Sequence, residues 1–321
     1  MTRTSMIKTL MCLLIIFSLQ EMMDSAYARS INDSMGKTSL TWLKTVSDAE
    51  ISAAGECLAA RDGIAGLLVH PAAVAGITDS RVKLSYVRHY VDSQYGSIGY
   101  ARKYKGRFVG IRMNYVNYGE FIRTNKQGKV EGTFTAGDIG FSVNVGKQVR
   151  DDLKIGATVS YLTSRIEEFT SRAATVDLGV LYHPPFEGLS VGAVLSNMGK
   201  VFKSYSSGYE ETLPVIFTVG ARKELIHSPL TLMADIIFPN DNDIVYAFGV
   251  KAAVKNTLSL YAGIKSRTDI DVQTMKAETD YSGITTFGFG ISLERYRFNY
   301  ACCLDDAIEN IHKVTLGIRV P

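Results

Sequence analysis

The stretch that decides the fold reads DIGFSVNVGKQVRDDLKIGATVSY and runs from Asp138 to Tyr161. Apolar residues occupy every second position on both sides of the charged turn from Arg150 to Asp152. Because side chains of a strand alternate between its two faces, each half of this stretch has one apolar and one polar face. The pattern is typical of a tight antiparallel β-hairpin. A single hairpin of this kind suits a soluble sheet as well as a membrane barrel, so the rest of the chain has to decide.

The same alternation continues from Arg81 to the C-terminus and predicts fourteen strands. The expected strands are 82–90, 94–104, 108–118, 138–149, 154–166, 174–183, 189–196, 215–225, 230–238, 244–254, 258–266, 285–293, 296–303 and 313–320. Two-residue turns such as Lys105–Gly106 alternate with long loops such as 119–137 and 197–214. An even-stranded outer-membrane barrel with both termini in the periplasm sorts its connections in this way.

The polar faces of the expected strands carry charge. Arg112, Asp177 and Asp235 are examples, and each alternates with apolar neighbours. In a two-layer sandwich these groups would be buried without water, which is costly. A barrel lumen accommodates them, and the apolar faces then contact lipid. The sequence therefore predicts an all-β protein, a 14-stranded antiparallel transmembrane β-barrel.

The N-terminus has the three parts of a secretory signal. Arg3 and Lys8 precede an apolar run from Leu10 to Leu19, and Ala26-Tyr27-Ala28 supplies small residues for cleavage after Ala28. The apolar run has roughly ten residues, whereas a membrane-spanning helix needs about 20. We therefore expect a signal peptide at 1–28 and a mature protein in the outer membrane of a Gram-negative-type bacterium, with both termini periplasmic.

Residues 29–80 differ from everything that follows. The part from 49 to 65 is rich in alanine, and LLVHPAAVAG at 67–76 has no alternation. We expect short helices and loops of a size that fits inside the barrel at 81–321 as an N-terminal plug. Asp62 has two open interpretations: a buried partner of a luminal arginine such as Arg112 or Arg222 that locks the plug, or a helix cap.

Composition excludes several classes of function. A net charge of +3 is too small to indicate nucleic-acid binding. Three cysteines follow the signal, Cys57, Cys302 and Cys303, and an odd number excludes complete intramolecular pairing. We interpret them as small apolar residues and expect no metal or cofactor. None of the five histidines stands on a strand with a suitably spaced serine, so the sequence predicts no enzyme.

Three short motifs in the plug resemble a known family. The segment Ser47–Glu56, the tripeptide Ala60-Arg61-Asp62 and the tripeptide His70-Pro71-Ala72 are similar to the N-terminal pattern of the PorV/PorQ family. Segments 84–87, 95–101 and 117–119 resemble PorQ more than PorV. These proteins are outer-membrane barrels of the type IX secretion system and are related in fold to the fatty acid transporter FadL. The resemblance implies a plugged fourteen-stranded barrel whose plug motif is Gly55, Asp62, His70, Pro71 and Ala72.

The resemblance also implies two alternative functions, both non-enzymatic. In the first, the barrel holds secretion-system subunits or secreted cargo with C-terminal sorting domains, and Phe202, Tyr205 and Tyr209 form a partner-binding loop. In the second, it is a FadL-like channel for uptake of hydrophobic small molecules. The channel needs an apolar pocket between plug and wall, for which Trp42, Leu67 and Leu68 are scattered candidates.

Overall fold

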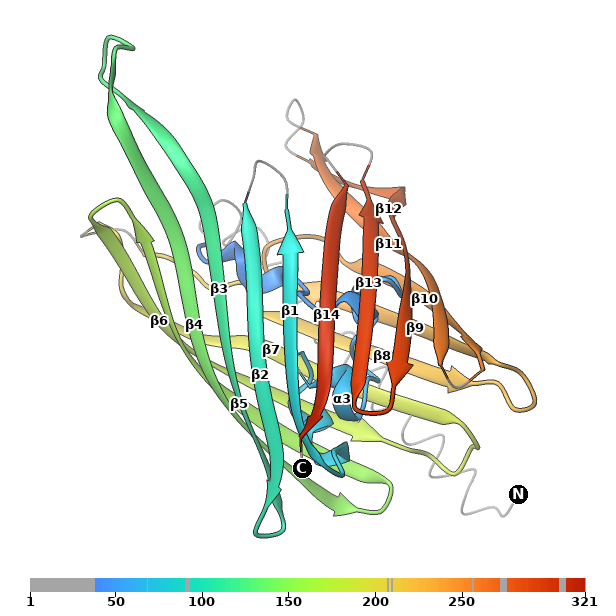
Figure 1. Ribbon diagram of the computed structural model, residues 1–321. Coiled ribbons are helices and arrows are strands. Elements are labelled where there is room, and N and C mark those ends of the chain that lie inside the picture. The colour runs from blue at the N-terminus through green and yellow to red at the C-terminus, as the bar shows by residue number, and fades with distance from the viewer. Residues whose placement is uncertain are drawn as a thin grey trace.

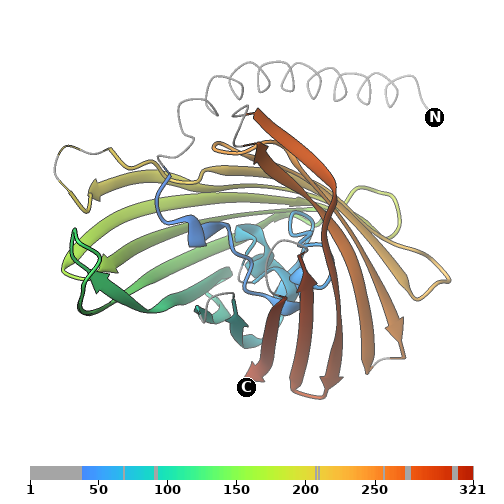
Figure 2. The same ribbon diagram turned by 90° about the horizontal axis from the view of Figure 1, so that it is seen from above.

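The computed structural model describes residues 38–320 except 68, 90–92, 207, 209, 256, 272–275 and 306–309. Its fourteen antiparallel strands form one closed barrel in which β1 pairs with β14 (Figures 1 and 2). The predicted fold class is confirmed. The strands are β1 (Ser80–Arg88), β2 (Gln94–Tyr104), β3 (Arg107–Thr124), β4 (Val130–Arg150), β5 (Leu153–Ile166), β6 (Phe169–Tyr182), β7 (Leu189–Lys203), β8 (Ile216–Glu224), β9 (Leu230–Pro239), β10 (Val245–Val254), β11 (Leu258–Asp271), β12 (Lys276–Leu293), β13 (Tyr296–Leu304) and β14 (Ile311–Val320).

The outer face of the barrel is apolar. Ile111 on β3, Val143 on β4 and Val159 on β5 are direct cross-strand partners. Their exposed fractions are 57%, 53% and 58%. A row of exposed branched apolar side chains would be unfavourable in water, but it is what the lipid-facing side of an outer-membrane barrel requires. The hairpin at Asp138–Tyr161 therefore has its apolar face on the outside, as its alternation predicts.

The prediction of a long loop at 119–137 is wrong. Strand β3 continues to Thr124 and β4 begins at Val130, so only residues 125–129 form the turn. The rings of Phe121 and Phe134 face each other across this hairpin with centroids 5.3 Å apart, which stabilises strand pairing beyond the barrel. The hairpin rises above the rest of the molecule in Figure 1.

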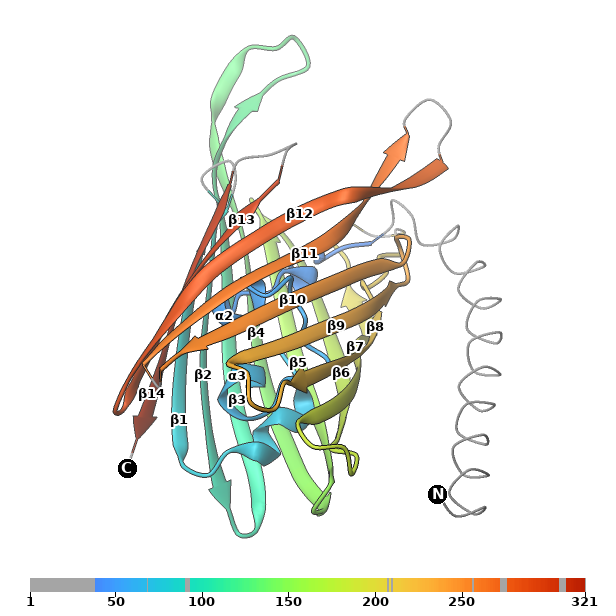
Figure 3. The same cartoon turned by 90° about the vertical axis from the view of Figure 1, so that its right-hand side faces the viewer.

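The wall is uneven in height. Strand β4 has 21 residues, whereas β8 has 9 and β9 and β10 have 10 each (Figure 3). Pro214 stands just before β8, and Pro239 ends β9. Proline has no backbone N–H for a ladder hydrogen bond, which accounts for strand ends at these positions. The wall is therefore low on the side of β8 to β10, which we call the low side, although β1, β13 and β14 are equally short with 9, 9 and 10 residues.

The lumen contains a plug made of residues 38–79 (Figure 2). Its helices are η1 (Thr41–Lys44), α2 (Ala49–Ser52), α3 (Gly63–Gly66) and η2 (Pro71–Gly76). Asp48 caps α2 by accepting a hydrogen bond from the Ile51 amide at 3.1 Å. Isolated helices this short are unstable in water, so they depend on contacts with the wall. No helix in the described part of the chain is long and apolar enough to cross a membrane.

The plug runs the length of the lumen. At one end, Thr38 forms a parallel bridge with Thr212, in the connection between β7 and β8. At the other end, Ser80 begins β1 beside Val320 of β14. The chain thus enters at the long-loop end of the barrel and leaves at the short-turn end. The signal peptide and the mature N-terminus lie outside the described residues, so the predicted cleavage and periplasmic location of the terminus stay predictions.

Candidate functional site

Four carboxylates of the plug meet cations of the wall. Asp48 pairs with Lys83, Glu50 with Arg297 at 3.0 Å, Glu56 with Lys265 at 2.6 Å and Lys313 at 2.9 Å, and Asp62 with Lys154. We call these contacts the plug ion pairs. They reach β1, β5, β11, β13 and β14, so the plug is held from several sides of the barrel.

Glu50 and Glu56 each lie beside two cations, and Glu50 is the more deeply buried of the two. Its carboxylate is 3% exposed and lies between Arg297 and the plug's own Arg61, which is 3.7 Å away. Burial by itself would raise the pKa of Glu50, but the charges of Arg297 and Arg61 outweigh it and lower that pKa to about 2. Burial opposes ionisation of Glu56 in the same way, and Lys265 and Lys313 lower its pKa to about 2. Both acids are therefore charged at neutral pH.

The wall also holds the plug backbone. Asp235 of β9 accepts hydrogen bonds from the amides of Leu58 at 2.6 Å and Ala59 at 2.8 Å. Next to it, Gly192 of β7 leaves room for the Ala59 carbonyl, which a Cβ at position 192 would overlap. Two separate strands thus fix the same turn of the plug.

The structure brings the predicted plug motif to the interface between plug and wall. The Gly55 amide donates to Thr286 at 3.0 Å, and the Pro71 carbonyl accepts from Asn144 at 3.1 Å. His70 accepts from the Ala72 amide through Nδ1 at 3.1 Å, and burial lowers its pKa to about 4, so its ring is neutral at neutral pH. Ala72 is fully buried.

Asp62 is the cap of helix α3, and it also forms an ion pair with the wall, but its side chain is 25% exposed and its partner is a lysine. Its Oδ1 accepts from the Gly63 amide at 2.7 Å at the start of α3, and its Oδ2 pairs with Lys154 and lies 3.6 Å from His183 Nε2. The expected arginine partners are wrong. Arg222 pairs with Glu224, and Arg112 reaches Ser142 at 3.4 Å. Lys154 lies at the short-turn end of β5, close to the plug's exit, which is why it meets Asp62.

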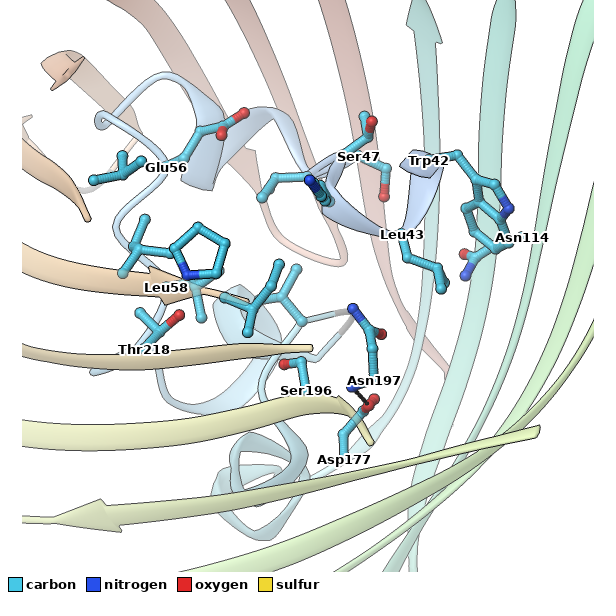
Figure 4. A pocket seen from close by; sticks show the side chains of 18 of the residues that line it. Trp42, Leu43, Ser47, Glu56, Leu58, Asn114, Asp177, Ser196, Asn197 and Thr218 are labelled. Carbon is cyan, nitrogen blue, oxygen red and sulfur yellow. Dashed lines mark hydrogen bonds between the residues drawn. The ribbon is translucent and has the colours of Figure 1, made fainter. Parts of the chain in front are cut away.

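A cavity of about 230 Å³ remains between the plug and the low side of the wall (Figure 4). We call it the luminal cavity. Its apolar lining comes from the plug, through Trp42, Leu43 and Leu58, and from the wall, through Ile216, Ile237 and Val245. Its polar lining includes Lys44, Glu56, Arg112, Asn114, Asp177 and Lys265. The cavity is therefore amphipathic.

Trp42 forms one side of the luminal cavity, beside Asn114 (Figure 4). It is 5% exposed, and its ring packs against that of Tyr95 with centroids 5.9 Å apart. Its indole Nε1–H has no hydrogen-bond partner among the described residues. A buried donor without a partner is costly to the folded protein. Of the three apolar candidates in the sequence, Leu67 lines a smaller hollow of about 20 Å³, and Leu68 lies outside the described residues.

A β-bulge shapes the opposite side of the cavity. Ser196 and Asn197 of β7 together face Asp177 of β6, because the pairing shifts between Val176 and Leu178. Asn197 has a left-handed backbone conformation, with φ of 62°, and its backbone N–H donates a hydrogen bond to Oδ1 of Asp177 at 2.7 Å. Bulges re-aim side chains at sheet positions near binding sites. Here the bulge directs Asp177, Ser196 and Asn197 to the cavity (Figure 4).

The predicted partner loop is divided between two environments. Phe202 is 56% exposed and packs against Tyr161 on the barrel surface, with ring centroids 6.0 Å apart. Tyr205 instead donates to Ser164 inside the mouth of the barrel. Tyr209 lies outside the described residues. The structure therefore places Phe202 on the outer surface and Tyr205 inside the barrel, so the two rings do not form one surface.

The three cysteines in the described part of the chain, Cys57, Cys302 and Cys303, are free and buried. Burial raises the pKa of the Cys57 thiol, which makes it a poor nucleophile. The described residues contain no group of three or more His, Cys, Asp and Glu side chains arranged to hold a metal ion.

Comparisons with known proteins identify the fold. The chain is similar to the toluene transporter TodX of Pseudomonas putida, with 12% identity and a TM-score of 0.61, over 84% of this chain and 97% of that one. It is also similar to the CymD monoaromatic hydrocarbon channel, with 10% identity and a TM-score of 0.66, over 87% and 98%. The fold is that of a FadL-type outer-membrane barrel. No family model and no curated protein sequence matches the chain.

At these identities the FadL-type similarity establishes the fold alone. The FadL-like part of the resemblance drawn from the sequence is therefore supported, and the part specific to PorV/PorQ and type IX secretion stays a prediction. TodX and CymD are each described as a monoaromatic hydrocarbon channel. Sequence analysis missed Asp48, Glu50 and Glu56 as a group. Their signal was the concentration of acids in a segment expected to lie inside a lumen rich in cations.

Proposed function

We propose that this outer-membrane protein is a channel that admits a small amphipathic molecule to the luminal cavity. The observation that carries the proposal is the cavity itself, which lies between a fixed plug and the wall and has both apolar and hydrogen-bonding sides. The fold shared with TodX and CymD supports the same class of function, since each of them is described as a monoaromatic hydrocarbon channel.

The size of the cavity limits the ligand. An apolar cavity of about 150 Å³ holds benzene, and a water molecule occupies about 30 Å³ of the liquid. A cavity of about 230 Å³ therefore suits one substituted benzene ring or a short aliphatic chain with one polar group. The ring or chain would lie against Leu58, Ile216 and Ile237, and its polar group would meet the hydrogen-bonding side of the cavity at Asn114, Ser196 and Thr218.

The plug ion pairs determine how such a molecule would pass. Because Glu50 and Glu56 are charged, buried and paired with wall cations, moving the plug as a body would separate several buried charges. We infer that the plug stays in place and that the solute moves along the low side of the wall, where the cavity lies.

Trp42 provides a direct test, because it is the one tryptophan of the 321-residue chain. Toluene and benzoate should each be titrated into the purified protein while tryptophan fluorescence is recorded. We expect a saturable change for at least one of them, and its loss in Thr218→Phe, which fills the cavity from β8. Val219→Phe on the same strand points away from the cavity and serves as the matched control. No response up to millimolar ligand, or equal responses in both variants, would contradict the proposal.

A second candidate function is the binding of a partner protein, such as a secretion-system subunit or cargo with a C-terminal sorting domain. The β3–β4 hairpin favours it, because Ile122 and Val130 there are 67% and 60% exposed beyond the barrel. The test is co-purification from outer membranes with the full protein, with Ile122→Ser and Val130→Ser combined, and with a variant lacking residues 202–209. Unchanged recovery of partners in either variant would remove the hairpin or the loop, respectively, from the candidate interface.

A further inference from the structure

A basic depression opens at the short-turn end of the barrel, where the plug leaves the lumen. It has a volume of about 400 Å³, and we call it the basic pocket. Its charged lining is Asp79 from the end of the plug, Arg102 and Lys103 from β2, Arg295 from the turn between β12 and β13, and Arg319 from β14. Segments far apart in the sequence thus bring four cations to one hollow.

These cations outnumber their acidic partners. Asp79 is the only carboxylate in the lining, and its Oδ2 already lies 3.1 Å from Arg81 and 3.4 Å from Arg319. Among the described residues, Arg102, Lys103 and Arg295 form no ion pair. Four positive charges against one negative charge leave a surplus of three in the lining. Cations gathered at this density repel one another unless an anion lies between them.

The basic pocket lies where the lipid-facing surface ends. Side chains of β2 alternate between its two faces, and Ala101 is fully buried on the luminal side. Arg102 therefore lies on the outward face, after Ile98 and Tyr100. Tyr104 and Tyr296, next to the pocket, are 53% and 56% exposed. Exposed tyrosines at the end of an apolar band mark the level of the lipid headgroups. The pocket is therefore open both to the edge of the bilayer and to water.

We propose that the basic pocket binds the phosphate group of an anionic phospholipid. Guanidinium groups form two parallel hydrogen bonds to phosphate oxygens, and Arg102, Arg295 and Arg319 supply three of them around one hollow. The position of Arg102 on the lipid-facing side favours a phosphate carried by a lipid over one free in solution. A bound headgroup joins the plug exit, the end of β2 and the β12–β13 turn at the place where β1 and β14 close the barrel.

The test is retention of phosphatidylglycerol by the purified full-length protein, measured by native mass spectrometry, with phosphatidylcholine of the same chains as the comparison lipid. The pocket variant is Arg102→Gln with Arg295→Gln. The control variant is Lys105→Gln with Arg107→Gln, which removes the same charge from the same end but outside the pocket lining. We expect about thirtyfold weaker binding of phosphatidylglycerol in the pocket variant, at roughly tenfold per 1.4 kcal/mol and about 1 kcal/mol per basic residue. The control variant should retain the lipid.

Each alternative result has a meaning. Equal loss in both double variants would show a diffuse charge effect and overturn the pocket. Equal retention of phosphatidylcholine and phosphatidylglycerol would overturn the requirement for an anionic lipid. A pocket that binds inorganic phosphate at millimolar concentration, with loss in the pocket variant but no retention of phosphatidylglycerol, would assign the site to free phosphate and overturn the lipid. Heat-modifiable gel mobility of each variant shows that the barrel is folded.

Discussion

At the scale of single residues, buried charge decides how the plug is held. Glu50 lies between two guanidinium groups, and removing its charge leaves Arg61 and Arg297 facing each other without compensation. Breaking a buried pair from one side costs about 3–5 kcal/mol. The sequence showed an acid at position 50, but its partner Arg297 is 247 residues away, and no local pattern indicates such a pairing.

Glu50→Gln should therefore lower the stability of the folded barrel by about 3–5 kcal/mol. The measurement is the temperature at which the heat-modifiable band of the purified protein is lost in detergent. The exposed Glu131→Gln in the β3–β4 hairpin is the control and should change stability by less than about 0.5 kcal/mol. A Glu50 variant as stable as the control would show that the ion pair does not hold the plug.

The same residues give a dependence on pH. The pKa values of Glu50 and Glu56 fall from 4.5 to about 2 on folding, so their stabilisation is complete above about pH 4.5 and is lost as the pH falls through 2. We expect unfolding in detergent to become steeply easier between pH 4.5 and pH 2. Glu50→Gln should flatten this dependence, and an unchanged slope would mean that other acids cause it.

At the scale of elements, the plug approaches the wall closely at glycines, which have no side chain to keep the two backbones apart. A Cβ at Gly192 of β7 would overlap the Ala59 carbonyl, and one at Gly156 of β5 would overlap Pro71. Glycine in a strand often marks such a close approach, but it also occurs at β-bulges and at positions where it only weakens the strand. The sequence could therefore predict strands from alternation, yet it could not identify which glycines face the plug. The sequence did not predict the hairpin at 119–137, because Gly128 in its turn and Gly132 near the start of β4 are both typical of a loop.

Gly192→Ala should destabilise the protein by about 1–3 kcal/mol, the usual cost of overpacking, because the displaced Ala59 also donates to Asp235. Gly110→Ala on β3 is the matched control, since its nearest neighbour would be 3.5 Å from the new Cβ. Thermal unfolding in detergent measures both. If the two variants unfold together, the plug does not pack against β7 as described.

At the scale of the whole molecule, the apolar outer face places the barrel in a membrane. This property could be predicted from the sequence, because a period of two repeats over fourteen segments. The cavity could not be predicted, since it depends on a plug that leaves part of the lumen beside β6 to β11 unfilled. Trp42 was visible as an apolar candidate, but its missing hydrogen-bond partner appears only in three dimensions.

The position of the membrane can be tested on a single strand. Arginine in place of Ile111, which belongs to the exposed row on β3, should cost about 2–4 kcal/mol and reduce folding into lipid vesicles. Arginine in place of Ile122, also on β3 but in the projecting hairpin, should leave folding nearly unchanged. Equal effects of the two substitutions would contradict a bilayer that ends below the hairpin.

The path of the plug through the lumen has a consequence for biogenesis. Lys313 of β14 donates to the Val46 carbonyl, and Thr315 accepts from the Ala49 amide, across 267 and 266 residues. These bonds form only after the last strand has been synthesised, so residues 46–49 of the plug gain their contacts with the wall only when β14 is in place. Contacts of such long range slow folding. Closure of the seam between β1 and β14 thus becomes the step that traps the N-terminal segment, and a chain arrested before β14 would leave that segment accessible to periplasmic proteases.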